Sequence, residues 1–442
     1  MPAFSGCYSI PVDPLTFAPA MATLIERDKK AVWHPYTPQK SMPEPIPVVK
    51  GDGAYIIDEN GKAYIDAISS WWVTIHGHAN PYIAEKIYEQ AKTLEQVIFA
   101  GFTHEPAVRL AERLLEILPG DFAKIFYSDN GSTAVEVGVK MALQYWWNKG
   151  NTKRNKILAL NHSYHGDTFG TMSLSNRSVF TLAFQDKLFD VIFTDAPTKG
   201  SPLYDGPWDE IACFIYEPLL QGVGSMNMYD ATALNKLLQN CHAHDVICIA
   251  DEVMTGFGRT GKLFSSLYVD EKPDIICLSK GLTGGTMALG VTACTNNIHS
   301  AYVDDDRTKT FFHGHSFTAN PPACAAALAS MDLLLKTDCQ QQIARISQQQ
   351  QQFVQQLSTD KRFETRVKNV RSIGTIMAFE IESGRDGYLN TIGMDVTRKA
   401  LDQGVYLRPL GNTVYIMPPF CITAEELGKV HQAVITILGA IE

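Results

Sequence analysis

The chain has 442 residues, of which 45% are hydrophobic and 19% are charged, a balance typical of a globular protein with a large core and not of a disordered one. The formal net charge of −9 gives no support for nucleic-acid binding, which usually requires a basic face. The nine cysteines contain no Cys-x-x-Cys pair and most lie in apolar runs, so we expect reduced core thiols in a cytoplasmic protein. No stretch reaches the roughly 18 apolar residues of a membrane span, and we expect no membrane partner.

The first eighty residues divide into two expected parts. Residues 1–30 read as a loose extension, because the first twenty hold four prolines and no Lys or Arg and so lack the features of a signal peptide. Residues 54–70 predict a β-hairpin, in which the turn Glu59-Asn60-Gly61 joins two short strands. We assign residues 31–80 to the N-terminal part of a small domain.

The central region, residues 81–335, is predicted to form a large α/β domain. A helix is expected over residues 107–118, ending at Pro119-Gly120. From about residue 125 to 295, short apolar runs alternate with helical or loop segments, as expected for a mostly parallel sheet covered by helices on both faces. The runs are KIFYSD, KILALN, DVIFTD, IACFIYEP, VICIADE, DIICLSK and GVTACT. Polar side chains follow several of them, at the edge where open α/β sheets bind ligands: Asp129, Glu217, Asp251 and Lys280.

A strand-to-helix junction at residues 128–147 is the first candidate binding element. The turn at Gly131 and Ser132 precedes a helical stripe of apolar residues. Helix N-termini present free N–H groups and suit a phosphate, although a capped helix without a ligand also fits this pattern. The segment is neither a Gly-x-Gly-x-x-Gly motif nor a Walker loop, so nicotinamide and ATP binding lack their usual signature.

Three further features contribute candidate chemistry. The loop NHSYHGDT, residues 161–168, offers Tyr164 for stacking on a planar ligand; it suggests no metal site, because no second ligand cluster has recognisable spacing. Asp251 closes a buried strand before a Gly-rich loop and should have a cationic partner. Lys280, shielded from water at the end of another strand, would be a neutral amine and a nucleophile or base. A structural ion pair of Lys280 with Asp251 or Glu217 is the alternative.

The C-terminal region, residues 336–442, is predicted to be a smaller α+β domain. The Gln-rich stretch 339–357 is expected to form a solvated amphipathic helix, because its apolar residues fall near helical spacing. Strands are expected in TIMAFEIE, VYLRPL and TVYIMPPF. The predicted hairpin at residues 54–70 is far from the central sheet pattern, so we expect the two chain ends to pack together.

The candidate residues taken together indicate a cofactor more specifically than any one of them does alone. A phosphate cradle, a stacking aromatic ring, an acid and a lysine all fall at strand ends of one predicted sheet. Pyridoxal 5′-phosphate (PLP) requires this set: the lysine bonds the cofactor aldehyde, and the acid keeps the pyridine nitrogen protonated so that the ring accepts electrons. The residues alone therefore favour a PLP enzyme.

Two motifs, ADEVMTGFGRTG (250–261) and SKGLTGG (279–285), make the chain similar to the class III PLP-dependent aminotransferases. The resemblance runs from about residue 30 to the C-terminus. It implies the fold type I arrangement: α/β, with a large cofactor-binding domain around a mostly parallel sheet and a smaller α+β domain from both chain ends. It also implies a homodimer with active sites at the interface.

The resemblance carries functional roles onto individual positions. It implies that Lys280 is the catalytic lysine, that Asp251 faces the pyridine nitrogen, and that Tyr164 stacks near the ring. The implied phosphate ligands are Gly131 and Ser132, with His315 and Ser316 from the neighbouring subunit. The implied substrate-binding residues are Tyr36, Trp71, Tyr164, Lys280, Gly314 and Arg408. Arg408 would bind a substrate carboxylate, and Tyr36 would stack on adenine. The alternative for Arg408 is a surface salt bridge. The alternative for the SSWW segment, which contains Trp71, is packing in the protein core.

Within this family, the chain most resembles the branch that transfers the amino group of S-adenosylmethionine to 8-amino-7-oxononanoate, giving 7,8-diaminononanoate in biotin biosynthesis. The segments that carry this resemblance are WHPYT, DAISSWWVTIHGH, FAGFTHEPA, KMALQYW, YHGDTFGTMS, HGHSFTANPPACAAA and LRPLGNTVYIMPP. The chain departs from the family where His315 and Ser316 replace a usual Pro-Thr pair, and where Asn130 replaces a common serine.

Three alternatives remain open from the sequence. Another ω-aminotransferase is disfavoured by Met254, because ornithine- and 4-aminobutyrate-type relatives usually carry Gln there. A lysine-using enzyme of the same pathway is disfavoured by Tyr36. A catalytically silent homologue is disfavoured by the intact set of Lys280, Asp251 and Arg408.

Overall fold

The computed structural model describes residues 22–41, 43–200, 204–384 and 387–441. The chain divides into two compact units, one made of residues 1–50 and 57–62 and the other of residues 51–56 and 63–442. Most of the predicted loose extension, residues 1–21, lies outside the described residues. The four-part domain division expected from the sequence remains a prediction.

The first unit contains one helix and one tight turn. Helix α1 (Leu24–Ala31) begins with a capping box, in which Thr23 and Glu26 exchange side-chain and backbone hydrogen bonds, so this part of the expected extension is helical. At the turn, Gly61 adopts a φ of +80° and donates to the carbonyl of Asp58 at 3.0 Å. The unit boundaries fall within strands β1 (Val48–Asp52) and β2 (Tyr55–Asp58), and β3 (Ala63–Asp66) follows the turn, as the hairpin pattern predicted.

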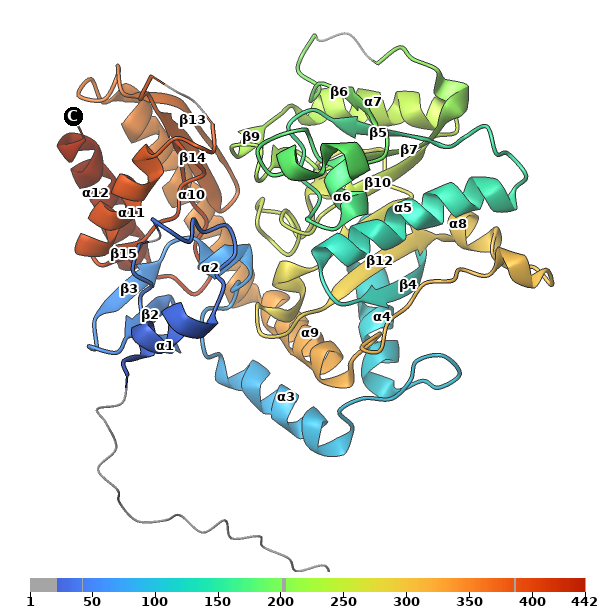
Figure 1. Cartoon of the computed structure of the whole chain (residues 1–442), viewed down its shortest axis with the longest axis horizontal. Helices are drawn as coiled ribbons and strands as arrows, with labels where there is room; N and C mark the ends of the chain where they lie inside the picture. Colours follow the sequence, from blue (N-terminus) through green and yellow to red (C-terminus); the bar gives the residue numbers. More distant parts are fainter. Residues whose placement is uncertain (1–21, 42, 201–203, 385–386, 442) are drawn as a thin grey trace, which may run out of the picture. The chain divides into compact units, whose positions relative to one another are not determined.

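A seven-stranded sheet forms the centre of the second unit (Figure 1). Its order is β4-β12-β11-β10-β7-β5-β6, and only β12 runs antiparallel to its neighbours. Every apolar run read from the sequence is one of these strands, and the mostly parallel sheet is confirmed. Their bounds are β4 Phe122–Ser128, β5 Lys156–Leu160, β6 Ile192–Thr194, β7 Ile211–Tyr216, β10 Ile247–Asp251, β11 Ile275–Leu278 and β12 Gly290–Thr295.

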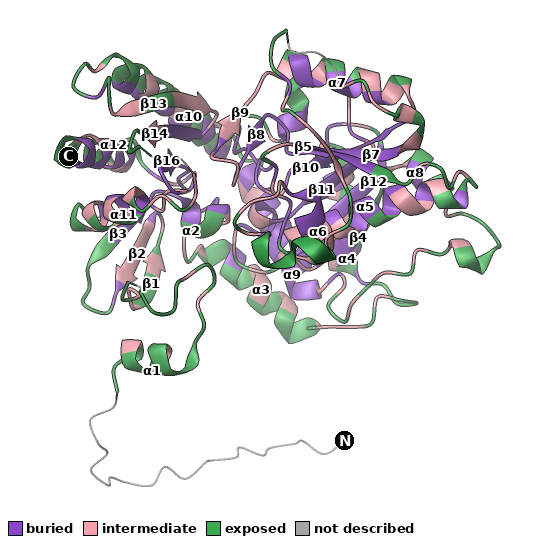
Figure 2. Ribbon diagram, turned by 45° about the horizontal axis from the view of Figure 1, so that its top comes forward, coloured by how far each residue is buried: buried purple, intermediate pink, exposed green. Residues whose placement is uncertain are grey.

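The central strands are apolar throughout because both of their faces are covered (Figure 2). Along β7, Cys213 and Ile215 pack with the helix α5 (Gly131–Asn148), whereas Phe214 and Tyr216 belong to the core on the opposite face. That opposite core includes side chains of α4 (Glu105–Ile117) and α7 (Ala231–Ala243). The remaining helices here are α2 Ser69–Trp72, α3 Pro81–Thr93, α6 Phe169–Leu174, α8 Asn296–Ser300 and α9 Pro321–Leu334.

Short elements connect this framework. Two small strands, β8 (Leu220–Gln221) and β9 (Asn227–Met228), pair antiparallel beyond the end of β7. The 3-10 turns are η1 Leu182–Lys187, η2 Trp208–Glu210, η3 Ser265–Tyr268, η4 Lys280–Thr283 and η5 Arg307–Lys309.

The C-terminal residues form a three-stranded sheet covered by helices, as predicted for an α+β region. The sheet has the order β13-β14-β16, and the Gln-rich stretch is the helix α10, which buries Ile343, Ile346, Phe353 and Leu357. The bounds are α10 Thr337–Thr359, β13 Val367–Ile373, β14 Ile376–Ile381, α11 Ile392–Asp402, β15 Val405–Tyr406, β16 Thr413–Ile416 and α12 Ala424–Ala440. Strand β15 pairs in parallel with β3, with Val405 opposite Ile65, so the expected packing of the two ends of the chain is confirmed.

Among the described residues, no helix combines the length and the apolar character that a membrane span needs. The eight described cysteines form no disulfide.

Candidate active site

A cavity of about 530 Å³ lies at the carboxyl ends of the central strands. The four polar residues predicted at this edge all line it: Asp129 after β4, Glu217 after β7, Asp251 at the end of β10 and Lys280 after β11. The structure therefore brings together residues that are far apart in the sequence. Further lining residues are Trp72, Gly131, Ser132, Tyr164, His165, Val253, Met254, Ser279, Gly285 and Thr286.

The N-terminus of α5 opens onto this cavity. Asn130 caps the helix by accepting from the N–H of Thr133 at 3.0 Å, and Thr133 Oγ1 accepts from the N–H of Asn130 at 3.1 Å. The α-helical pattern provides no internal acceptors for the first N–H groups of α5, including those of Gly131 and Ser132, and the positive end of the helix dipole lies at the same point. This end of the helix is suited to an anion.

Two glycines keep the cavity open beside the helix N-terminus. A Cβ at Gly131 would lie 2.6 Å from Cγ1 of Val253. A Cβ at Gly166, whose φ is +134°, would lie 2.0 Å from Oγ of Ser132. Any larger residue at these positions would displace the side chains that shape the cradle.

The sequence predicted a cationic partner for Asp251, and in the structure its carboxylate pairs with the imidazole of His165. Nδ1 of His165 lies 2.7 Å from Oδ2 of Asp251, and the backbone N–H of Val253 donates to Oδ1 at 3.1 Å. Both side chains are almost fully buried. Nε2 of His165 is also buried and makes no hydrogen bond with any described residue. The contacts with His165 and with the Val253 N–H therefore hold the carboxylate in one orientation.

Lys280 has an unusual backbone and a weakly basic amine. Its φ is +44°, a left-handed conformation that is costly for a residue with a Cβ and that directs the chain sharply away from β11. Burial lowers the pKa of the Lys280 amine to about 8, although the carboxylates of Asp251 and Glu217 oppose the shift. Nζ lies 4.7 Å from the ring centroid of Trp72. Lys280 forms no ion pair with either described carboxylate, so the alternative of a structural ion pair is wrong.

Glu217 holds the backbone of Tyr164, an aromatic residue that lines the cavity. Its Oε2 accepts from the backbone N–H of Tyr164 at 3.1 Å, and its Oε1 accepts from the N–H of Gly222 at 2.9 Å. Burial raises the pKa of Glu217 to about 7. The sequence placed Glu217 at a strand end and offered it only as an alternative ion-pair partner of Lys280, so its role in holding Tyr164 and Gly222 was not predicted.

Arg259 is a second residue that sequence reasoning did not assign. It is fully buried, and its guanidinium donates to the carbonyl of Pro418 at 2.8 Å and to that of Trp72 at 3.3 Å. Burial lowers the pKa of Arg259 to about 9. Because Trp72 Nε1 also donates to the hydroxyl of Tyr415 at 3.0 Å, this network fixes the Trp72 ring as one wall of the cavity.

The two adjacent tryptophans have different environments. Trp72 lines the cavity, whereas the predicted substrate residue Trp71 is 39% exposed and stacks on the guanidinium of Arg408, with 4.5 Å between Cζ and the ring centroid. Trp71 and Arg408 thus lie together, but neither lines the cavity described above.

The remaining predicted residues are not among those that line this cavity. Tyr36 belongs to the first unit and is 40% exposed. Gly314, His315 and Ser316 lie on the loop between η5 and α9 and do not line the cavity of their own chain. The carbonyl of Ser316 accepts from Nε2 of Gln96 at 2.6 Å, which fixes that part of the loop.

Comparison with known proteins places these features in a family. The family model "Aminotransferase class-III" matches residues 36–438. An adenosylmethionine-8-amino-7-oxononanoate aminotransferase of Synechococcus elongatus is 44% identical over 93% of this chain and 99% of its own length, and one of Geobacter sulfurreducens is 38% identical over 92% and 95%.

Solved structures agree with the sequence comparison. The crystal structure of an adenosylmethionine-8-amino-7-oxononanoate aminotransferase from Methanocaldococcus jannaschii superposes with a TM-score of 0.88 at 32% identity, covering 95% of this chain and 99% of the other. An ω-transaminase from Pseudomonas jessenii, in complex with PMP, gives 0.86 at 26% identity, with 95% and 98% covered. The chain therefore belongs to the class III aminotransferases, which are PLP-dependent transaminases.

Proposed function

We propose that this enzyme moves the amino group of S-adenosylmethionine, through PLP, to 8-amino-7-oxononanoate, giving 7,8-diaminononanoate in biotin biosynthesis. Relatives that are 34–44% identical to this chain over more than nine-tenths of its length are named for this reaction. The observation that carries the proposal is the shared cavity at the strand ends, where Lys280 and Asp251 meet beside a helix N-terminus.

The residues around the cavity fit PLP. The cradle at Gly131 and Ser132 presents N–H groups to an anion and has no room for a larger side chain at Gly131. A buried carboxylate, Asp251, supplies an acceptor for a protonated ring nitrogen. Tyr164 lines the same cavity and supplies a flat aromatic surface. When bound, PLP supplies an aldehyde that takes up the amino group and a ring that withdraws electrons from the carbon that loses a proton.

Lys280 is the proton carrier in this proposal. An amine with a pKa of about 8 is partly neutral near neutral pH, so Nζ can accept a proton from Cα of the amino donor and return it to the adjacent reacting carbon. The left-handed backbone at Lys280 brings the amine back over the cavity beside the Trp72 ring. A lysine with an ordinary pKa would remain charged and could not act as a base.

Asp251 holds the ring nitrogen in its protonated state. The hydrogen bond from His165 and that from the N–H of Val253 orient the carboxylate before the cofactor arrives. We therefore assign His165 as a positioning residue, which acts through Asp251.

The proposal includes a homodimer. His315 and Ser316 do not line the cavity of their own chain, which supports their assignment to the phosphate site of a neighbouring subunit. Ser316 retains the hydroxyl donor of the usual threonine, and His315 adds a backbone N–H that proline lacks. The eight described cysteines are free, which supports the proposed cytoplasmic location.

The substrate site is proposed to combine apolar walls with one fixed cation. The Arg408 guanidinium lies over the Trp71 ring, with 4.5 Å between Cζ and the ring centroid, and we assign it to a substrate carboxylate. Tyr36, Tyr164 and Gly314 complete the proposed substrate contacts, with Tyr36 stacking on the adenine of S-adenosylmethionine. Two dissimilar substrates suit such an aromatic wall because stacking does not depend on their polar groups.

A screen of amino donors tests the proposal. Purified enzyme, saturated with PLP, receives 8-amino-7-oxononanoate as acceptor and one donor at a time: S-adenosylmethionine, lysine, glutamate or alanine. The proposal predicts 7,8-diaminononanoate with S-adenosylmethionine only. Product with lysine alone would assign the lysine-using reaction, and transfer to other ketones without any to the oxononanoate would assign a general ω-transaminase.

A further inference from the structure

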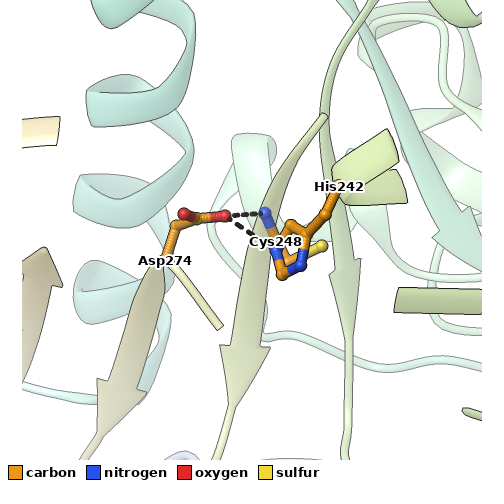
Figure 3. A group of neighbouring side chains, drawn as sticks. All are labelled: His242, Cys248 and Asp274. Atoms are coloured by element: carbon orange, nitrogen blue, oxygen red, sulfur yellow. Dashed lines mark hydrogen bonds and ion pairs between the residues drawn. The ribbon is translucent and has the colours of Figure 1, made fainter. Parts of the chain in front are cut away.

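Three potential metal ligands meet at the edge of the sheet opposite the cavity (Figure 3). His242 lies on the last turn of α7, Cys248 near the start of β10 and Asp274 just before β11. One ligand atom from each lies within 4.8 Å of the others. The neighbouring strands end at Asp251 and Leu278, beside the proposed active site, so this cluster is at the amino ends of the same strands.

The imidazole of His242 has the orientation of a metal-binding histidine, with one ring nitrogen paired to a carboxylate and the other facing the remaining ligands. Its Nδ1 lies 2.9 Å from Oε2 of Glu271, which accepts the Nδ1 proton and turns Nε2 toward the other two residues. Nε2 is buried and lies 3.3 Å from Oδ2 of Asp274. A carboxylate behind the distal nitrogen is the usual companion of a histidine that binds zinc.

The backbone around the cluster is held in place independently of any ion. The N–H of Cys248 donates to Oδ2 of Asp274 at 2.8 Å, and the N–H of Asp274 donates to the carbonyl of Cys248 at 2.9 Å. Asn235, two turns before His242 on α7, accepts from the N–H of Glu271 at 2.9 Å. Helix, strand and loop are thus fixed relative to one another, so side-chain movements alone are needed to bring the ligand atoms closer.

We propose that His242, Cys248 and Asp274 bind a zinc ion, with Glu271 as the outer partner of the histidine. One imidazole, one thiolate and one carboxylate form a donor set that suits Zn²⁺ and is a poor one for Mg²⁺ or Ca²⁺. In tetrahedral zinc sites with bonds of about 2.0–2.3 Å, neighbouring ligand atoms lie about 3.3–3.6 Å apart, so ligand atoms that lie within 4.8 Å of one another need to approach by at most about 1.5 Å. The fourth position is open to water.

The metal competes with an ion-pair state of the same residues. Without the ion, the imidazole of His242 lies between two carboxylates, with Nε2 3.3 Å from Oδ2 of Asp274 and Nδ1 2.9 Å from Oε2 of Glu271. Zinc displaces the proton from Nε2 and the proton of the Cys248 thiol, and both protons pass to solvent. The bound ion replaces that pairing and links α7, β10 and the loop before β11.

The test uses the PLP-saturated, full-length enzyme after treatment with a chelator and desalting. Zinc is titrated and the bound metal is counted, and cobalt(II) is then used as a spectroscopic substitute. The proposal predicts one high-affinity ion per chain and, with cobalt, a thiolate-to-metal charge-transfer band. His242→Gln and Cys248→Ser remove the high-affinity binding, and Cys248→Ser also removes the band. Glu271→Gln weakens binding by about 10- to 100-fold.

Matched substitutions control for nearby groups. His244→Gln changes the other histidine at the end of α7, which instead bonds the carbonyl of Asn240, and Cys324→Ser changes a buried cysteine on α9. Both controls should bind zinc as the unaltered enzyme does. Absence of binding to the unaltered enzyme overturns the proposal, as does equal binding to the His242 and Cys248 variants. If a variant does not fold, a cobalt spectrum of the unaltered enzyme without a thiolate band overturns it.

Discussion

Nδ1 of His165 lies 2.7 Å from Oδ2 of Asp251, within a pair of side chains that are almost fully buried behind the cavity. These residues come from different parts of the chain, one from the loop after β5 and the other from the end of β10. Their contact fixes the carboxylate on which the proposed chemistry depends.

Replacing His165 with alanine should reduce kcat by about 10- to 150-fold, because a hydrogen bond to a charged group contributes about 1.5–3 kcal/mol. His165→Asn should recover part of the loss, since its amide can donate to Asp251. Steady-state kinetics and the absorbance of bound cofactor measure both effects. His299→Ala, which changes a histidine on α8, is the control, and an unchanged kcat in His165→Ala would contradict a positioning role.

Removing the Lys280 amine should change how stability depends on pH in the cofactor-free protein. The folded-state pKa falls from 10.5 to about 8, so the unfolded chain binds more protons between these values and wild-type stability rises with pH across that window. Below pH 8, Lys280→Met should therefore be more stable than wild type, by at most about 3 kcal/mol. The difference should shrink toward pH 10.

Thermal unfolding of the two proteins from pH 7 to pH 10 measures this difference. Lys262→Met, which changes a lysine outside the cavity, is the control and should show no such trend. A constant difference between Lys280→Met and wild type over the whole range would show that the amine does not titrate near 8.

Adding a methyl group to the phosphate cradle should weaken PLP binding. In Gly131→Ala the new Cβ would lie 2.6 Å from Cγ1 of Val253, so Val253 or the first turn of α5 must move. We expect at least a tenfold increase in the Kd of PLP, which corresponds to about 1.4 kcal/mol. Cofactor titration by fluorescence measures the change. Gly439→Ala, a helical glycine with open space around it, should leave the Kd unaltered.

Truncating Arg408 should act selectively on acceptors that carry a carboxylate. Arg408→Ala should raise the KM for 8-amino-7-oxononanoate by about 10- to 100-fold, because a charge-assisted pair is lost. Uncharged ketone acceptors should be affected little. Arg398→Ala, an exposed arginine on α11, serves as the control. Equal losses with charged and uncharged acceptors would assign Arg408 to structure instead.

Two inactive variants should complement each other if phosphate ligands cross between subunits. A mixed dimer of Lys280→Ala with a His315→Ala/Ser316→Ala double variant contains one site with every native group, because the Lys280→Ala subunit lends its native loop to the site that keeps Lys280. We expect each variant alone to lose most of its activity and the mixture to recover up to about one quarter of wild-type activity on random mixing. Recovery no greater than the sum of the two variants would place these residues outside the partner's site.

The sheet and most cavity residues were predictable because they follow local rules. Strands buried on both faces appear as continuous apolar runs, and the polar residues that end the parallel runs are candidates for the ligand-binding edge. Asp129, Glu217, Asp251 and Lys280 were found in this way. The helix at Gly131 was equally visible because Asn130 is a good cap and apolar residues follow at helical spacing.

The remaining parts of the site depend on contacts between distant segments. His165 was one of two histidines in a loop, and nothing local distinguishes it from His162. Arg259 followed a Gly-rich loop, but its acceptors, the carbonyls of Trp72 and Pro418, are 187 and 159 residues away. Positive φ values at Ser70 and Trp72 break the helical pattern in SSWW, so spacing could not show which tryptophan faces the cavity.

Reduction with borohydride tests the central claim most directly. The PLP-saturated enzyme is reduced, digested and mapped by mass spectrometry to find the residue joined to the cofactor. The account predicts a single modified lysine, Lys280, and loss of this label in Lys280→Ala. A cofactor fixed to a different lysine, or a protein that takes up no PLP at all, would contradict the assignment of the cavity and of the reaction proposed for it.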